Sequence, residues 1–157
     1  MIRRPPRSTL DRSSAASDVY KRQMYQAGTL SGNPIAVAAG LATLNILQDQ
    51  KIYKDLEVTS DRLSKSIMEE GNSLGLNIEV NRVGSLMTIF FSQGSVDSWD
   101  DVINADQERY TKFFIELLRG GVYIAPSPFE AMFVSAAHSI TDIDETVSVM
   151  RNALSQV

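Results

Sequence analysis

The amino-acid sequence predicts a mixed α/β fold, in which the end of one lobe is followed by a small α+β domain. Three features carry this prediction. Amphipathic helical patterns recur at residues 52–70, 106–119 and from 141 onward, two short apolar runs at 76–83 and 86–91 flank a glycine, and an Ala-rich helix precedes them all. Helices interleaved with short strands are typical of a small α+β domain with an antiparallel or mixed sheet.

The composition is that of an ordinary globular protein. The chain has 157 residues, of which 43% are hydrophobic and 22% charged, with a net charge of −4. This excludes collagen-like and low-complexity classes, and the length allows one domain with a real core. The absence of Cys excludes thiolate catalysis, and a single His, His138, excludes a multi-His metal site within one chain. We expect no metal and no membrane span, because no apolar run approaches the roughly 20 residues that a span needs.

Residues 1–23 differ from the rest, because they are basic whereas the remainder is acidic. A nucleic-acid-binding arm and a transit peptide are two explanations, but Asp11 and Asp18 interrupt the charge and Pro5-Pro6 opposes a helix. The string MIRRPPRSTLDRSSAASDVYKRQ also resembles the translated sequencing adaptor seen ahead of truncated environmental gene fragments. We favour this third explanation. It predicts that residues 1–23 are non-native and unpacked, that no nucleic acid is bound, and that the natural chain was cut before Met24.

A loop at residues 24–32 leads into the first helix. Asn33 is suited to cap the free N–H groups of a helix and Pro34 suits the first position, so a helix is expected from there to Leu47. Small and apolar residues occupy nearly all of its sides, which is typical of a buried helix. The polar residues 48–50 then mark a boundary between two lobes.

The second helix is expected at Ile52–Glu70, with Gly71 and Asn72 ending it. Strands follow at 76–83 and 86–91, joined by a tight turn at Gly84, and the second is the more buried because it is continuously apolar. The polar segment 92–104 is predicted to be a solvated loop, with Trp99 packed on the domain edge.

A third helix is expected at residues 106–119, with Gly120-Gly121 as its stop and with an inward face of Tyr110, Phe113, Leu117 and Leu118. A short strand at 122–124, a rigid loop at 126–128 and a strand at 132–136 follow. The last helix begins at Thr141, and acidic residues in its first turn suit the helix dipole. Its core face is Ile143, Val147, Met150 and Leu154. The predicted order after residue 50 is therefore α-β-β-α-β-β-α.

The strongest local signal for chemistry is the segment Gly28-Thr29-Leu30-Ser31-Gly32, directly before the first helix. Two glycines permit positive φ, two hydroxyls offer donors, and a helix N-terminus favours an anion. A phosphate-binding loop has these properties. A plain capped turn has them too, and the residues alone favour the turn.

Three blocks of the sequence resemble the class III pyridoxal-phosphate (PLP) aminotransferases. They are QAGTLSGNP with the following AAGLATL, NRVGSLMTIFF at 81–91, and GVYIAPSPFEA at 121–131 with Ala137-His138. The resemblance covers residues 24–157, and Pro128, where the family often has Gln, is a conservative departure. It implies a fold type I enzyme with PLP as cofactor, in which residues 24–50 end the large PLP-binding domain and residues 51–157 form the C-terminal small domain. It also implies a homodimer, with the cytoplasm as the default location.

The resemblance assigns roles to a few residues. Gly28 and Thr29 would bind the cofactor phosphate, Thr29 that of the partner subunit. The Lys that holds the cofactor lies upstream of this loop in the family, and no Lys of this chain is a credible substitute. Glu130 would be catalytic, because in the family this Phe-Glu pair lines the mouth of the active site, where a carboxylate can position a substrate amino group or move protons. A solvated or Arg-paired carboxylate at a strand end is the other interpretation of Glu130.

Other polar residues are expected to be structural. His138 is interpreted as a hydrogen-bonded structural histidine, and Ser85 and Arg82 as turn and strand-edge residues.

The activity that the resemblance implies, in its narrower form, is transfer of an amino group within one small five-carbon substrate of tetrapyrrole synthesis. An ω-aminotransferase with two separate substrates is an alternative, although its Arg-centred carboxylate site is not found here. A folded or dimerising lobe without activity is another alternative, and it is what we expect of the 157-residue chain by itself.

Overall fold

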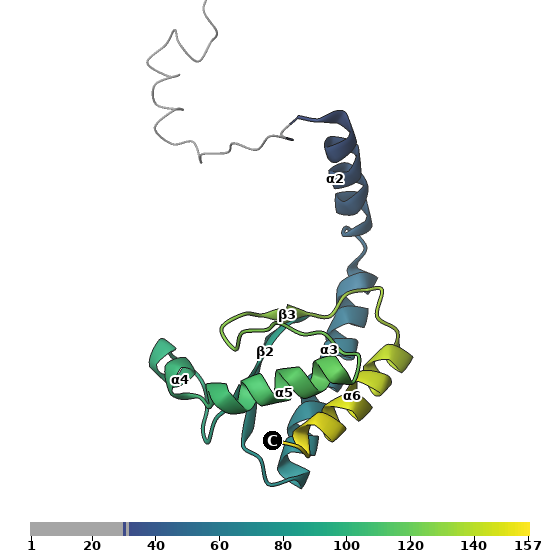
Figure 1. Ribbon diagram of the computed structural model, residues 1–157. Coiled ribbons are helices and arrows are strands. Elements are labelled where there is room, and N and C mark those ends of the chain that lie inside the picture. Colours follow the sequence, from purple (N-terminus) through teal and green to yellow (C-terminus); the bar gives the residue numbers. More distant parts are fainter. Residues whose placement is uncertain (1–29, 31) are drawn as a thin grey trace, which may run out of the picture. The chain divides into compact units, whose positions relative to one another are not determined.

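The computed structural model describes residue 30 and residues 32–157 (Figure 1). These fall into two compact units, one that ends at Ile46 and one at Leu47–Val157, which are described separately. The expectation for residues 1–23 and the assignments of Gly28 and Thr29 lie outside the described residues.

The first unit contributes one helix, α2 (Pro34–Ile46). The Asn33 side chain accepts hydrogen bonds from the backbone N–H groups of Ile35 and Ala36, at 3.0 and 3.2 Å, so the predicted cap is confirmed. The expectation that this helix is buried is wrong for the described chain, where none of its residues is buried and Ile35 is 80% exposed. The helix is apolar on nearly every side, but its own unit holds no second described element to cover it.

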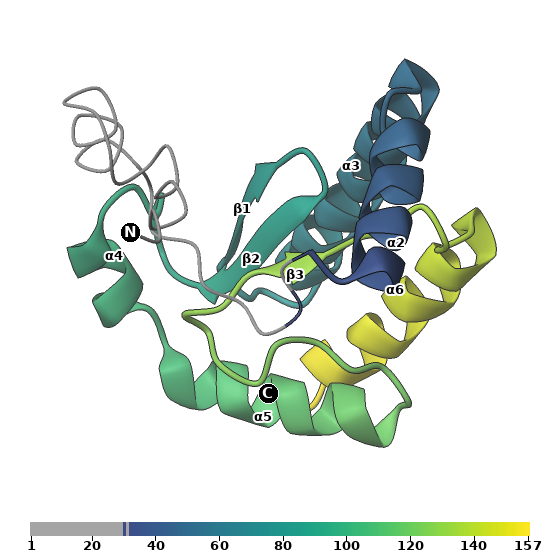
Figure 2. The ribbon, with the colours of Figure 1, turned by 90° about the horizontal axis from the view of Figure 1, so that it is seen from above.

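The second unit is an α+β domain, in which α3 (Gln50–Ser73) leads into a hairpin of β1 (Ile78–Val83) and β2 (Leu86–Phe91). Then come α4 (Trp99–Asn104), α5 (Gln107–Arg119), β3 (Met132–Phe133) and α6 (Ile140–Leu154). The sheet has the order β1-β2-β3, and both of its pairings are antiparallel. Helices α3, α5 and α6 pack together on one face of this sheet (Figure 2).

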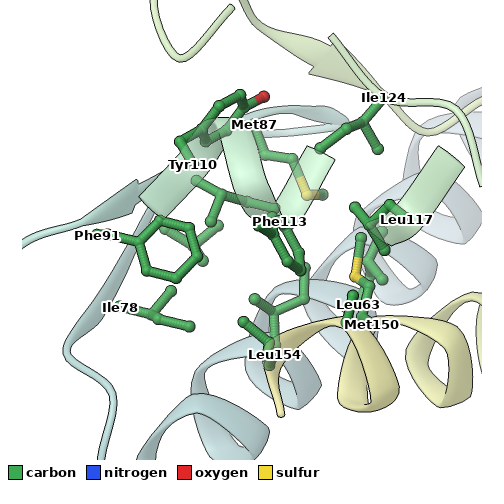
Figure 3. Close-up of a cluster of buried hydrophobic side chains, with 14 of the residues drawn as sticks. Leu63, Ile78, Met87, Phe91, Tyr110, Phe113, Leu117, Ile124, Met150 and Leu154 are labelled. Carbon is green, nitrogen blue, oxygen red and sulfur yellow. The ribbon is translucent and has the colours of Figure 1, made fainter. Parts of the chain in front are cut away.

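The core lies between the helices and the inner face of the sheet (Figure 3). Phe113 and Leu117 of α5 are fully buried, as is Met150 of α6, and the Phe113 ring meets the Phe91 ring edge-on at 5.5 Å between centroids. The predicted helical core faces are thus confirmed, except that Leu118 is 50% exposed. Residues 117 and 118 differ by about 100° around a helix, so only one of them is directed at the core.

Helix α3 is longer than predicted, because Gly71 and Asn72 lie inside it rather than ending it. A Cβ on Gly71 would lie 2.5 Å from Cδ1 of Ile78, so the glycine allows β1 to pack closely against the last turn of α3. The helix stops at Leu74, and Gly75 supplies the positive φ of 72° that follows.

Three further expectations need correction. The segment 92–104 is not all loop, because Ser98 and Asp101 form a capping box that starts α4. Residues 122–124 are not a strand, although the side chain of Ile124 is buried in the core. The strand expected at 132–136 is reduced to Met132–Phe133, since β3 pairs with β2 only at Leu86 and Met87.

The outer face of the sheet carries an apolar row at one end. Val83, Leu86 and Phe133 are partners across the three strands, so their side chains lie on the same face. They are 80%, 37% and 67% exposed. No described helix is long and apolar enough to cross a membrane.

Candidate functional site

Glu130 lies on an irregular loop between two buried anchors. Ile124 before the loop and Val134 after it are 7% and 5% exposed, whereas Glu130 itself is exposed. A turn shapes the loop, in which the N–H of Glu130 donates to the carbonyl of Ser127 at 3.1 Å and the N–H of Phe129 donates to the Ser127 hydroxyl at 3.2 Å. Glu130 is therefore presented by a turn two residues before β3.

Two side chains from neighbouring helices contact this loop. The Tyr110 hydroxyl of α5 donates to the carbonyl of Ala125 at 2.7 Å. The Trp99 ring of α4 lies against the Phe129 ring, with 5.6 Å between centroids. Trp99 thus packs on the domain edge, as expected, and the residue that it meets directly precedes Glu130.

The electrostatics link Tyr110 to Glu130. Burial, and to a lesser degree the negative charge of Glu130, raises the pKa of Tyr110 to about 12. The phenol therefore stays protonated at neutral pH and keeps its hydrogen bond to Ala125.

His138 has the structural hydrogen bond that the sequence predicts. Its Nδ1 accepts from the backbone N–H of Ser135 at 3.0 Å. His138 also lines a cavity of about 250 Å³, together with Asp142 and Thr146 on its polar side. The carboxylate of Asp142 is occupied in the capping box of α6, and its hydrogen bonds with Ser139 lower the pKa of Asp142 below its usual value. The carboxylate of Asp142 and the Nδ1 of His138 are therefore already engaged in structural hydrogen bonds.

The start of α2 bears on the phosphate-loop interpretation. Gly32 has a φ of 77°, which favours glycine, and a Cβ there would meet nothing within 4 Å, so the position is open. The first N–H groups of α2 are already used: Asn33 accepts from Ile35 and Ala36 through its side chain and from Val37 through its carbonyl. Pro34 has no N–H. Hydrogen-bond donors to a bound phosphate would therefore come from residues before Asn33, where Gly28 and Thr29 lie outside the described residues.

The lysines of the described chain do not fit the role of a cofactor-holding Lys. Three of the four form ion pairs within one helix, namely Lys51 with Asp55, Lys65 with Asp61 and Lys112 with Glu108. The hydrogen bond and charge of Asp55 raise the pKa of Lys51 and so favour its ammonium form. Only the free amine of a Lys can react with the aldehyde of a cofactor. Lys54 lies on the exposed surface of α3.

The arginines are committed in the same way. Each of the five arginines among residues 32–157 pairs with a carboxylate. Arg82 is the most shielded, with its side chain 17% exposed, and it contacts Glu57 at 2.8 Å and Asp61 at 3.3 Å while donating to the carbonyl of Gly84 at 2.8 Å. The Glu57 hydrogen bond is the main reason that the pKa of Arg82 is raised. Arg82 therefore ties α3 to the hairpin, a role that its position at a strand edge does not reveal.

No group of three or more His, Cys, Asp or Glu side chains within the described ranges could hold a metal ion. Two polar features remain as candidates for a functional site. One is the Glu130 loop with its contacts to Tyr110 and Trp99. The other, in the first unit, is the start of α2.

Solved structures define the class of protein to which this fold belongs. No family model matches the chain. A glutamate-1-semialdehyde aminomutase from Pseudomonas aeruginosa aligns with a TM-score of 0.72 at 19% identity over 90% of this chain and 34% of its own. A β-phenylalanine aminotransferase from Variovorax paradoxus aligns with a TM-score of 0.71 at 24% identity over 89% and 33%. The fold is therefore that of a fragment of a PLP-dependent transaminase, and the predicted α/β class is confirmed.

The sequence matches are more specific than the fold. The chain is 44% identical to the glutamate-1-semialdehyde 2,1-aminomutase of Chlorobium phaeobacteroides over 148 residues, 94% of this chain and 33% of the relative. It is 47% identical to that of Chlorobium limicola over 131 residues, 83% of this chain and 30% of the relative. The chain thus resembles the C-terminal region of glutamate-1-semialdehyde 2,1-aminomutase and spans about a third of the length of these relatives. The longer match extends into residues 1–23, whereas the shorter one is close to the length of residues 24–157.

Proposed function

We propose that this chain is the C-terminal part of a PLP-dependent aminomutase that converts glutamate-1-semialdehyde to 5-aminolevulinate for tetrapyrrole synthesis. The observation that carries the proposal is the identity of 40 to 47% to aminomutases of that name. The structural likeness does not separate the alternatives, since an ω-transaminase from Sphaerobacter thermophilus aligns with a TM-score of 0.70 at the same 19% identity as the Pseudomonas aminomutase. A fold of this kind hosts several activities.

PLP is the cofactor of the proposed enzyme, and it supplies the electron sink for moving an amino group. Gly28 and Thr29 would hold its phosphate, supported by the open, positive-φ position at Gly32 and by the N-terminus of α2 behind it. The Lys that holds the cofactor would come from the part of the protein that precedes these residues. The 157-residue chain by itself is proposed to be inactive.

Glu130 would act on the substrate. Its exposed carboxylate, held on a turn between two buried anchors, is suited to receive a proton from a substrate ammonium group or to orient that group by a charged hydrogen bond. No arginine pairs with it among the described residues, so the Arg-paired interpretation gains no support.

The ω-aminotransferase alternative would carry an Arg-centred site for a substrate carboxylate. The arginines at residues 62, 82, 109, 119 and 151 each form an ion pair with a carboxylate of the described chain. None of them forms the Arg-centred carboxylate site that is expected of this alternative. Homodimer formation and a cytoplasmic location belong to the same proposal and follow from the family resemblance.

A chimera tests the proposal. In it, the last third of the Chlorobium phaeobacteroides aminomutase is replaced by residues 24–157 of this chain, and formation of 5-aminolevulinate from glutamate-1-semialdehyde is measured. We expect activity within about 100-fold of the intact relative, because a misplacement of about 1 Å can lower a rate by that factor. A folded, PLP-loaded chimera without this activity would contradict the proposal.

A further inference from the structure

We propose that Trp99 and Tyr110 are positioning residues, which together hold the Glu130 loop in place. The inference rests on the proposed function, since the position of Glu130 matters for turnover only if Glu130 acts on the substrate. The two side chains come from neighbouring helices and reach the loop at its two ends, Tyr110 at Ala125 and Trp99 at Phe129. We call this pair of contacts the loop clamp.

The loop needs such a clamp because its own interactions are local. The hydrogen bonds that residues 126–131 make as donors lead to Ser127, within the loop itself. Strand pairing with β2 begins at Met132, two residues after Glu130, so Glu130 is not held by the sheet. Without contacts to the helices, the segment between the buried Ile124 and β3 would be fixed only at its ends, and Glu130 would sample a range of positions.

Tyr110 supplies the rigid half of the clamp. Its side chain is 3% exposed and belongs to the core cluster, so the ring itself cannot move freely. In Figure 3 its hydroxyl oxygen lies at the edge of that cluster. The hydrogen bond from Tyr110 to the carbonyl of Ala125 therefore holds the start of the loop at a fixed place relative to α5.

Trp99 supplies the second half from α4. That helix is short but fixed, because the Ser98–Asp101 capping box closes its N-terminus and Val102 packs on Phe90, Val96 and Ala105 at the sheet. Trp99 is 64% exposed and Phe129 48% exposed, so the contact of their rings does not serve to fill the core. A large aromatic pair on the surface, adjacent to Glu130, is better explained by the position that it gives to the loop.

Amide hydrogen exchange on the 157-residue chain tests the clamp directly. The variants are Tyr110→Phe, which removes one hydrogen bond, and Trp99→Leu, which removes the aromatic contact. We expect exchange at the amides of residues 129 and 130 to be about fivefold faster in each, the effect of losing one ordinary interaction. Exchange in β1 and β2 and the far-ultraviolet circular dichroism should stay unchanged, which shows that the fold is intact.

Two matched controls accompany these variants. Tyr53→Phe removes a hydroxyl from an exposed Tyr of α3, and Trp99→Phe keeps an aromatic ring against Phe129. Both should leave loop exchange near the parent rate. Unchanged exchange at residues 129 and 130 in folded Tyr110→Phe and Trp99→Leu would overturn the inference.

The same substitutions in the chimera separate positioning from structure. Tyr110→Phe and Trp99→Leu should lower kcat about tenfold with little change of KM, and Trp99→Phe should restore it. If Glu130→Gln lowers turnover but faster loop exchange does not, the positioning inference is wrong and the proposed function stands. If Glu130→Gln has no effect, the proposed role of Glu130 is wrong, while the exchange rates still decide whether the clamp exists.

Discussion

Glu130 is the residue on which the proposed chemistry depends, and its exposed position on a turn makes it replaceable without loss of fold. We predict that Glu130→Gln in the chimera lowers turnover about 100-fold, within the range for general acid–base catalysis. PLP affinity should stay unchanged, because the carboxylate would act on substrate amines rather than on the phosphate. Stopped-flow absorbance of both half-reactions measures the first quantity, and equilibrium dialysis the second.

The control for Glu130 is Glu69→Gln, which removes a carboxylate from the exposed surface of α3. It should behave as the parent chimera does. If Glu130→Gln retains parent rates in both half-reactions, Glu130 is a solvated structural carboxylate.

Thr29 tests the phosphate loop at the residue scale. Because the first N–H groups of α2 are used by Asn33, donors from this segment to a phosphate would come from the residues before Asn33. Loss of a hydrogen bond to a charged group costs about 1.5–3 kcal/mol, or roughly a tenfold or greater loss of affinity. We therefore predict that Thr29→Val weakens PLP binding in the chimera by at least about tenfold, as equilibrium dialysis would show.

Thr111→Val is the matched control, since the Thr111 hydroxyl bonds only to the Gln107 carbonyl within α5. It should leave PLP affinity unchanged. An unaltered affinity in a correctly folded Thr29→Val chimera would mean that the segment Gly28–Gly32 is only a capped turn.

At the scale of elements, the packing of α3 on β1 depends on a glycine. Gly71→Ala would gain up to about 1 kcal/mol of helix propensity. It would also force a methyl group into the space of the Ile78 side chain, and overpacking costs about 1–3 kcal/mol. We predict a net loss of about 1 kcal/mol in the free energy of unfolding, measured by urea denaturation.

Gly40→Ala is the control for this prediction, because Gly40 is also inside a helix and a Cβ there meets nothing within 4 Å. It should not lower stability. A Gly71→Ala variant as stable as the parent would show that Ile78 shifts aside without cost.

The sequence predicted those helices and turns whose ends are set by residues close in sequence. Asp106 and Gly120-Gly121 mark the two ends of α5, and the positive φ of 59° at Gly84 gives the hairpin turn. Helix α4 was missed although the signal was present, since Ser98 followed three residues later by Asp101 is a capping-box pattern. Gly71 was misjudged because its reason is tertiary: it makes room for a side chain of another element.

The candidate site was less predictable than the fold. Glu130 is proposed on a family resemblance alone, and no periodicity distinguishes it from other exposed carboxylates. The loop clamp joins residues 15 positions apart in one contact and 30 apart in the other, through irregular backbone. No repeating pattern of residues encodes such contacts, so only the three-dimensional structure reveals them.

At the scale of the whole molecule, apolar surface is left open in both units. Ile35, Leu41 and Leu44 of α2 are more than half exposed, and so are Val83 and Phe133 on the sheet. Surfaces of this kind mark interaction sites. They agree with a chain that spans about a third of the length of its relatives.

The chain by itself should not bind PLP covalently. After incubation with PLP and reduction with borohydride, we predict only scattered substoichiometric labelling by mass spectrometry, because three of the four described lysines are paired with carboxylates. The matched positive control is the chimera, in which one Lys of the transplanted upstream part should be labelled stoichiometrically. Stoichiometric labelling of a single Lys in the 157-residue chain would contradict the proposal that the cofactor-holding Lys lies upstream of Gly28.

The central claim is that this region belongs to an aminomutase rather than to a transaminase with two substrates. The most direct measurement is turnover of the chimera on glutamate-1-semialdehyde with no added amino donor or keto acid. An aminomutase returns an amino group to the same carbon skeleton, so we predict many turnovers per active site with 5-aminolevulinate as the product. A reaction that stops after about one turnover and resumes only when a second keto acid or amine is supplied would contradict the account.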